Sequence, residues 1–359
     1  MKYKLFIGKI SGIKIFVHWT FGLLIAWVVY SDVKAGLETA DILWSIAFLL
    51  ALFACVTLHE LGHSLTAQRY HIKTRDITLL PIGGVASLES IPEKPKEELV
   101  ITLAGPLVNV AIALALLPFV QWPETTEAIQ GLTQVGGQNF LLSLMSVNIT
   151  LAVFNMIPAF PMDGGRILRA LLAYKMDRVK ATRIAAGIGQ LLAAGFVILG
   201  FYGNPFLVFI GIFIFMGAQA EARFAQGRAL VKNVTIQQVM MREVPTIESH
   251  FTIRDAAQSL LNSQNKNFVV TTQGQPVGTL THTDIIKALG EQGEGASVAS
   301  AMDRELIQLA AETSLEDGLK QLQSSRKPLA LVTANNSLIG IVDAQNIAEF
   351  LLIKQAQQK

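Results

Sequence analysis

Six apolar runs, each close to the length needed to cross a lipid bilayer, dominate the first 220 residues of this chain. A membrane-spanning helix needs about 20 consecutive apolar residues, or somewhat fewer with flanking anchors. Charged residues make up 16% of the chain, against about a quarter in ordinary soluble proteins, and the deficit falls almost entirely in this part. We therefore predict six transmembrane helices, near Ile15–Tyr30, Ile42–Leu65, Leu99–Val120, Phe140–Phe160, Ala185–Gly200 and Pro205–Ala220.

The basic residues between these runs predict how the chain crosses the membrane. Lysines and arginines gather before the first run, after the second, after the fourth and after the sixth. Loops with such an excess stay on the cytoplasmic side. The alternate loops hold almost none, and the loop Gln121–Gln138 carries only Glu124 and Glu127 as charged residues. We expect a multi-pass protein of the cell membrane with both termini in the cytoplasm.

The sequence after Ala220 is ordinary and soluble in character, and it repeats itself. Met240–Val244 returns as Met302–Leu306, and Pro276–Leu280 returns as Leu338–Val342, both without gaps. Self-similarity at a fixed period indicates two copies of one structural unit. These units resemble a tandem pair of CBS domains.

The fold class that follows is an α-helical polytopic membrane protein with six transmembrane helices, followed by a soluble α/β tandem CBS module. We place the membrane domain at residues 1–223 and a linker at 224–233. The two repeats then cover 234–295 and 296–359.

The second apolar run ends in His59-Glu60-Leu61-Gly62-His63. Residues four apart lie on one face of a helix, so both imidazoles can reach a single ion. Imidazole nitrogens suit Zn²⁺, and Glu60 can take a proton from a water at the metal. Cys55 is the only cysteine, so a metal has to be held by His, Asp or Glu. A polar cluster at the membrane interface is the alternative interpretation of the motif.

A catalytic zinc site takes three protein ligands, and the end of the fourth run offers the third. There Pro158 and Pro161 break the helix, and Gly164-Gly165 follows Asp163 directly. This pattern predicts an irregular segment that holds Asp163 toward the helix bundle, since irregular backbone at membrane depth is tolerated where it is buried or lines a cavity. A turn-forming Asp before two glycines is the alternative.

The HExxH motif and the distant NxxPxxPxDG motif together resemble the site-2 protease family of intramembrane zinc metalloproteases, and the resemblance covers the whole predicted membrane domain. It implies His59, His63 and Asp163 as the ligands of one zinc ion per chain, with Glu60 as the general base. It also implies that Asn155 helps to position the substrate or its oxyanion. Asn155 could equally hydrogen-bond a neighbouring helix.

The run Leu80–Ala86 resembles a membrane-dipping strand segment of the same family. A substrate helix keeps its carbonyls hydrogen-bonded, so part of it must unwind before water can attack. An exposed strand edge could receive the unwound stretch by β-addition. We therefore expect Gly83 and Gly84 to take part in substrate binding, with a simple turn as the alternative.

Gly278–Asp284 in the first CBS repeat resembles the adenosine-binding signature of that family. The resemblance implies that Thr281 and Asp284 bind an adenine nucleotide (ATP, ADP or AMP), with the aspartate on the ribose hydroxyls. Asn346 replaces this aspartate in the second repeat, which puts a second nucleotide site in doubt. Many CBS pairs serve only for dimerisation or docking, so that alternative stays open.

The expected function is hydrolysis of peptide bonds in or near transmembrane segments of membrane-protein substrates, as in regulated intramembrane proteolysis. A regulatory membrane protein and a second copy of the chain, bound through the CBS domains, are further expected partners. The net charge of +2 without a basic block gives no indication of nucleic acid. One alternative is a CBS-gated transporter, which would need polar residues recurring across several runs. Another is an inactive adaptor, against which the intact Glu60 argues.

Overall fold

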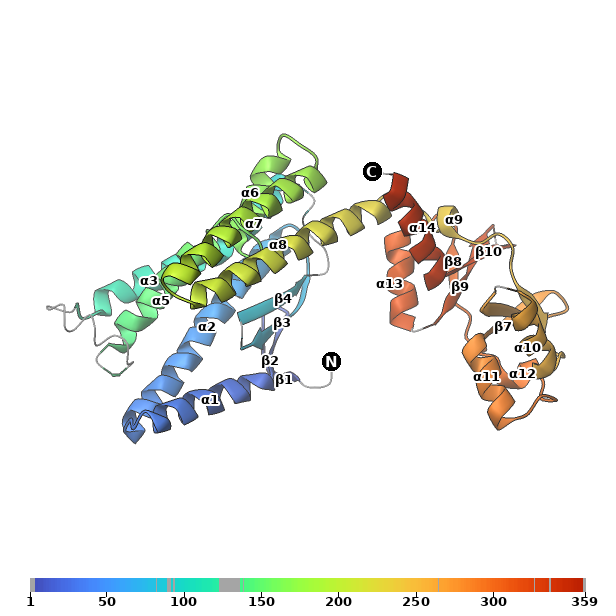
Figure 1. The fold of residues 1–359 in the computed structure, drawn as a ribbon, viewed down its shortest axis with the longest axis horizontal. Helices are drawn as coiled ribbons and strands as arrows, with labels where there is room; N and C mark the ends of the chain where they lie inside the picture. Colours follow the sequence, from blue (N-terminus) through green and yellow to red (C-terminus); the bar gives the residue numbers. More distant parts are fainter. Residues whose placement is uncertain are drawn as a thin grey trace. The chain divides into compact units, whose positions relative to one another are not determined.

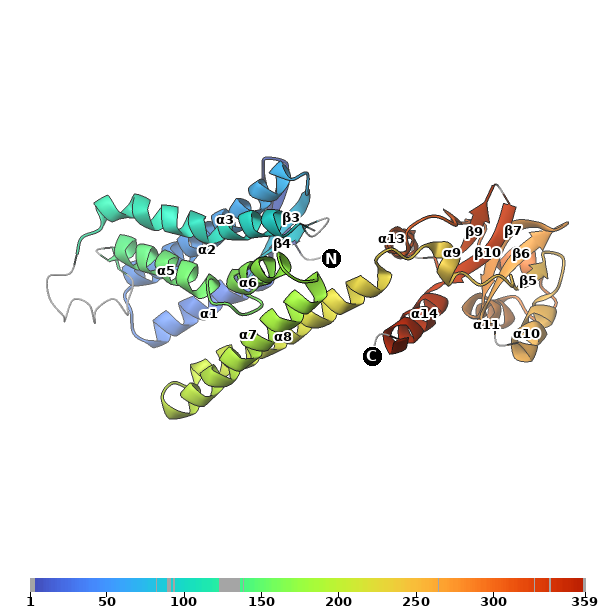
Figure 2. The same cartoon turned by 90° about the horizontal axis from the view of Figure 1, so that it is seen from above.

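The computed structural model describes residues 4–81, 83–88, 92, 94–122, 136–137, 139–263, 265–325, 327–335 and 337–357. The chain divides into two compact units, Met1–Ala225 and Gln226–Lys359 (Figures 1 and 2). Most of the loop Gln121–Gln138, used above to predict orientation, lies outside the described residues.

A four-stranded sheet opens the first unit. Its order is β1-β2-β3-β4, with a parallel pair β2–β3 between two antiparallel pairs. Ile13 and Ile77 are fully buried and pack with Phe21 and Phe53, which come from the first two helices. The strands are β1 Lys4–Ile10, β2 Ile13–His18, β3 Thr74–Leu80 and β4 Gly83–Leu88.

Helices make up the rest of the first unit. They are α1 Thr20–Lys34, α2 Thr39–Arg69, α3 Pro95–Leu116 with the 3₁₀ turn η1 Leu117–Phe119, α5 Phe140–Asn155, α6 Asp163–Ala173, α7 Arg178–Tyr202 and α8 Phe206–Val231. Both views show α7 and α8 running side by side (Figures 1 and 2). On α2, Gly62 allows a close approach to α3, since a Cβ there would lie 2.8 Å from the carbonyl oxygen of Ala104.

Among the described residues, four helices are long and apolar enough to cross a membrane: α2, α3 with η1, α7 and α8. Between 17% and 33% of the most apolar window of each helix is buried within the protein, so most of each window is not enclosed by other parts of the chain. The fourth predicted run forms the shorter helix α5. The first predicted run, Ile15–Tyr30, begins in strand β2 and continues as the 15-residue helix α1. Apolar length alone did not reveal that strand.

The second unit is built twice from the same elements. Its first half has α9 Ile236–Val239, β5 Thr246–Glu248, α10 Ile253–Asn262, β6 Asn267–Thr272, β7 Gln275–Thr281 and α11 His282–Glu291. Its second half has α12 Val298–Ala301, β8 Gln308–Ala310, α13 Leu315–Ser325, β9 Leu329–Ala334, β10 Ser337–Asp343 and α14 Ala344–Gln357. Each element begins 62 residues after its counterpart, which is the offset of the sequence repeat. The two three-stranded sheets, β5-β6-β7 and β8-β9-β10, have the same topology.

Candidate metal centre

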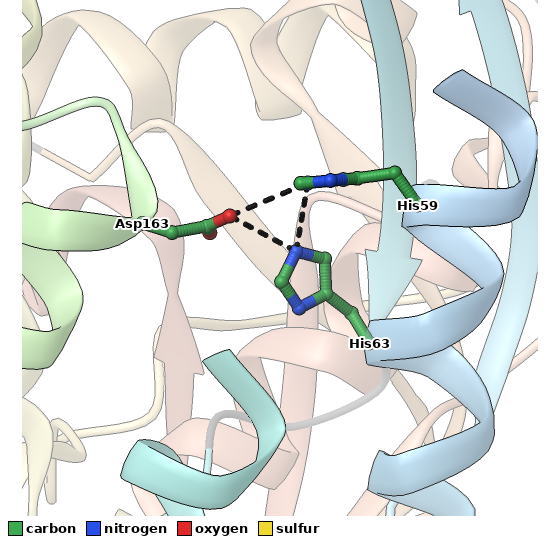
Figure 3. Close-up of side chains that lie close together, drawn as sticks. All are labelled: His59, His63 and Asp163. Atoms are coloured by element: carbon green, nitrogen blue, oxygen red, sulfur yellow. Dashed lines mark hydrogen bonds and ion pairs between the residues drawn. The ribbon is translucent and has the colours of Figure 1, made fainter. Parts of the chain in front are cut away.

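Three buried side chains from two distant motifs meet in the first unit. His59 and His63 lie one turn apart on α2, and their Nε2 atoms are 3.1 Å from each other. Asp163 is the first residue of α6, and its Oδ2 lies 3.1 Å from Nε2 of His63 and 3.3 Å from Nε2 of His59 (Figure 3). The structure thus brings the two imidazoles and the carboxylate together as the sequence predicts. Their ligand atoms all fall within 4.8 Å of one another.

Helix α3 fixes the orientation of both imidazoles. Nδ1 of His63 lies 2.8 Å from the carbonyl oxygen of Ile101, and Nδ1 of His59 lies 2.5 Å from Oδ1 of Asn109. A carbonyl oxygen only accepts hydrogen bonds, so each Nδ1 donates and each Nε2 keeps its lone pair free. Histidine ligands of metals are oriented in this way.

The amide group of Asn109 continues this network to a third helix. It donates to Oδ1 of Asn148 on α5 at 2.9 Å, and Asn148 donates to the carbonyl oxygen of Leu144 at 2.8 Å. Both asparagines are fully buried. The sequence interpretation assigned them no role, although polar residues inside apolar helices are a signal for a functional site.

Space for an ion beside the two imidazoles depends on Gly105 of α3. A Cβ at that position would lie 2.2 Å from Nε2 of His63 and 2.8 Å from Nε2 of His59. Two nitrogens and one carboxylate oxygen, with room beside them, form the donor set of a zinc site that keeps a position open for substrate or water. The residues present therefore fit a zinc ion.

The segment before Asp163 has the irregular backbone that its two prolines predict, because α5 ends at Asn155 and α6 begins at Asp163. Gly164 and Gly165 are not a sharp turn after the aspartate but belong to the first turn of α6. Close packing requires them: a Cβ on Gly164 would lie 2.1 Å from the carbonyl oxygen of Ile157. Their role is to let α6 begin directly against the preceding segment.

Glu60 lies between the two histidines in sequence and beside strand β4 in space. A Cβ on Gly84 would lie 2.7 Å from Cγ of Glu60, so this glycine allows β4 to approach α2. Gly83 has a φ of 134°, a backbone conformation that favours glycine. Both glycines begin strand β4, which is an edge strand paired with β3. Gly83 pairs with Leu80 and borders the connection between β3 and β4, whereas Gly84 lies within the strand. Their part in substrate binding stays a prediction.

Asn155 is the last residue of α5, and its side chain donates to the carbonyl oxygen of Leu151 in the same helix at 3.0 Å. Its hydrogen bond thus runs neither to the three clustered residues nor to a neighbouring helix. The predicted contact with substrate stays a prediction.

A second group of charged residues joins four helices of the first unit. Arg169 of α6 is 4% exposed, and its Nε donates to Glu98 of α3 at 2.8 Å. Its Nη1 donates to Glu221 of α8, while Arg178 of α7 pairs with the other oxygen of Glu98 at 2.9 Å. Two features of the sequence could have pointed to this group: Glu98 stands at the start of one apolar run, and Glu221 directly follows another. Their partners, however, lie far away in the sequence.

A cavity of about 320 Å³ lies in the second unit. Both residues predicted to bind nucleotide line it, and Oδ2 of Asp284 accepts from the Oγ1 of Thr281 at 2.7 Å and from its backbone N–H at 2.9 Å. Residues of both repeats contribute to the wall. They are Asn267, Thr279, Thr281, His282, Thr283, Asp284, Asp303, Lys327 and Pro328.

Comparison with known proteins identifies both units. Residues 47–199 match the model of Peptidase family M50, and residues 236–291 and 298–353 each match that of the CBS domain. A zinc metalloprotease of Methanocaldococcus jannaschii is 31% identical over 360 residues, which cover all of this chain and 99% of that protein. Stage IV sporulation protein FB of Bacillus subtilis is 30% identical over 137 residues, 38% of this chain and 44% of that protein. The solved site-2 protease of M. jannaschii shares 39% identity over 62% of this chain and 96% of its own, with a TM-score of 0.46.

The apolar helices, long enough to cross a membrane, and the cluster of two histidines and one carboxylate fit the class of membrane metalloproteases. The chain belongs to Peptidase family M50, the site-2 protease family of zinc metalloproteases, and carries two CBS domains.

Proposed function

We propose that this protein is an intramembrane protease that hydrolyses peptide bonds in or near the transmembrane segments of other membrane proteins. One observation carries the proposal: two imidazoles and a carboxylate converge with both Nδ1 atoms already engaged by α3. That arrangement leaves the facing Nε2 and Oδ2 atoms for a metal, next to a glutamate and a free strand edge.

In this mechanism His59, His63 and Asp163 hold one zinc ion, and the aspartate offsets part of its charge. Held by these residues, zinc would supply Lewis acidity toward the scissile carbonyl and would lower the pKa of a water toward about 7. Glu60 takes the proton from the attacking water and later delivers it to the nitrogen of the leaving amine. Its place on α2, next to His59, suits both transfers.

The substrate binds along β4. A transmembrane helix has to unwind locally to expose its scissile carbonyl, and the unwound backbone then loses its hydrogen bonds. The free edge of β4 offers N–H and C=O groups in their place. Gly84 lets this strand lie directly against Glu60, since a Cβ there would meet the side chain of the glutamate. Asn155 assists by positioning the substrate or its oxyanion, after releasing Leu151.

We further propose that the chain crosses the cell membrane six times, with both termini in the cytoplasm. Helices α1 and α5 complete the set of spans. The 15 residues of α1 cover about 22 Å of a hydrocarbon core of about 30 Å, and the apolar residues of β2 extend this length. The membrane domain is 1–223, the linker 224–233 is helical as far as Val231, and the repeats are 234–295 and 296–359.

The CBS module controls the enzyme by binding an adenine nucleotide at Thr281 and Asp284, in the cavity described above. It also joins two copies of the chain. The reaction belongs to regulated intramembrane proteolysis, with a further membrane protein restraining the enzyme. Calorimetry with ATP, ADP and AMP at millimolar concentrations tests nucleotide binding. A heat of binding in the wild type that is lost in Asp284→Ala would support the site. No heat in the wild type would rule out nucleotide binding.

Metal analysis of the purified protein tests the catalytic proposal without a substrate. We expect about one zinc per chain in the wild type and in a control, His71→Ala, whose histidine is exposed after α2. His59→Ala and Asp163→Ala should lose the zinc. Glu60→Gln should keep zinc but fail to cleave a single-span substrate in proteoliposomes. A wild type that binds no zinc after reloading would contradict the proposal and favour an adaptor that binds helices without cutting.

A further inference from the structure

Helix α8 packs directly on the segment that leads to Asp163. A Cβ on Gly217 would lie 2.6 Å from Cδ of Pro161, two residues before the aspartate. One residue further along α8, Ala218 is fully buried in one cluster with Phe160. The backbone of α8 at Gly217 therefore contacts the ring of Pro161 directly. No long side chain lies between them that could adjust if α8 moved.

A partly buried ion pair makes the second connection between α8 and the aspartate. Glu221, one turn after Gly217, accepts from Arg169, which lies on the helix that Asp163 begins. The guanidinium group of Arg169 also lies 5.1 Å from the centre of the Phe160 ring. Helix α8 thus contacts both the segment before Asp163 and the helix after it.

The exposure of these charges indicates which contact can be released. The side chains of Arg169 and Glu98 are 5% and 3% exposed, whereas that of Glu221 is 25% exposed. An unpaired buried charge is costly, so Arg169 stays with Glu98. The ion pair with Glu221 is the one that can break, because water can then replace the Glu221 carboxylate beside Arg169. Its helix, α8, runs on to Val231, past Ala225 where the first unit ends.

We propose that α8 is a positioning element for the metal centre. Through Gly217 and Glu221 it sets the place of the Asp163 carboxylate relative to the two histidines, and a displacement of α8 by the C-terminal unit changes the affinity for the metal. This inference rests on the proposed function, because it takes the three clustered residues to be metal ligands.

The rate of metal loss tests the inference on the full chain. The protein is loaded with Co²⁺, whose visible spectrum reports ligand geometry, and is then mixed with excess EDTA. We expect Glu221→Gln to lose cobalt about 10-fold faster, in the range seen when groups that support metal ligands are removed, with an altered spectrum and little change in Tm. The matched control is Arg223→Gln, which removes an exposed charge from the same helix. It should behave as the wild type.

A helix break beyond Glu221 tests the link to the C-terminal unit. Ala229→Pro interrupts α8 two turns after that glutamate, with Ala229→Ser as its control. The proline should change the rate of cobalt loss in the wild type and have a smaller effect in Glu221→Gln, where only the contact of Gly217 with Pro161 still connects α8 to the aspartate. Equal rates in the wild type, Glu221→Gln and Ala229→Pro would overturn the inference and leave the protease proposal intact. A wild type that binds neither zinc nor cobalt would remove both.

Discussion

Oδ1 of Asn109 lies 2.5 Å from Nδ1 of His59, so a buried residue of α3 sets the direction in which an imidazole of α2 presents its Nε2. The amide of Asn109 is held in turn by Asn148 of α5. The HExxH motif therefore depends on two further helices for its geometry.

Replacement of Asn109 by Ala should weaken zinc binding. The His59 ring would lose the acceptor that orients it, and loss of such a partner costs about 10- to 100-fold in metal affinity. Asn109→Asp keeps an acceptor for Nδ1 and should recover much of the affinity. Competition with a zinc chelator measures both. Equal affinities for the wild type and Asn109→Ala would contradict this account of the histidine.

A methyl group at Gly105 should exclude the metal without unfolding the protein. Its position, 2.2 Å from Nε2 of His63, requires the imidazole to move from the site. We expect Gly105→Ala to contain almost no zinc. Gly187→Ala is a matched control, since a Cβ on that helical glycine would meet nothing within 4 Å. Normal zinc content in Gly105→Ala would show that the space beside the histidines is not the ion's place.

Gly84→Ala should slow cleavage while zinc stays bound. The new methyl group would displace the side chain of Glu60, and a displacement of about 1 Å in an active site can cost about 100-fold in rate. We expect kcat to fall by that order, in a proteoliposome assay with a single-span substrate. Gly8→Ala, in the opposite edge strand β1, is the control because its Cβ meets nothing within 4 Å. Unchanged kcat in Gly84→Ala would argue against Glu60 as the base.

In the CBS module, the Lys327 ammonium hydrogen-bonds Asp303 and holds the pKa of that carboxyl below its usual value. A carboxyl whose pKa is lowered by folding stabilises the fold above its unfolded pKa of about 3.9, and this contribution is lost as the pH falls through the folded value. The effect is small because 41% of the Asp303 side chain is exposed. Thermal unfolding of this unit between pH 6 and pH 2 should lose less stability in Lys327→Met than in the wild type. Parallel pH curves would contradict the pairing.

The clustering of His59, His63 and Asp163 could be predicted from sequence because each motif fixes its own local geometry. The helical period places both imidazoles of α2 on one face, and two prolines follow the end of α5 and keep the chain from continuing as a helix toward Asp163. The CBS pair could be predicted because its elements recur at one offset. The roles of the three residues as zinc ligands stay predictions that metal analysis can check.

Strand β2 and the supporting polar residues could not be predicted in the same way. Ile13–His18 is as apolar as the helix that follows it, so hydropathy merges the two. The pairing of Arg169 with Glu98 joins residues 71 positions apart, and the contact of Asn109 with His59 joins residues 50 apart. Such contacts depend on how whole helices pack, which no local pattern specifies.

The parallel pairing of β2 with β3 has a practical consequence for work on this protein. The hairpin formed by β1 and β2 supports β3, and β3 is the neighbour of β4, the strand beside Glu60. Residues 4–18 are thus part of the sheet that lies beside Glu60, although they precede the first helix. A purification tag or fusion partner joined directly before Lys4 would disturb the pairing of β1 with β2 and with it the sheet beside Glu60. Such additions therefore belong at the C-terminus, after α14.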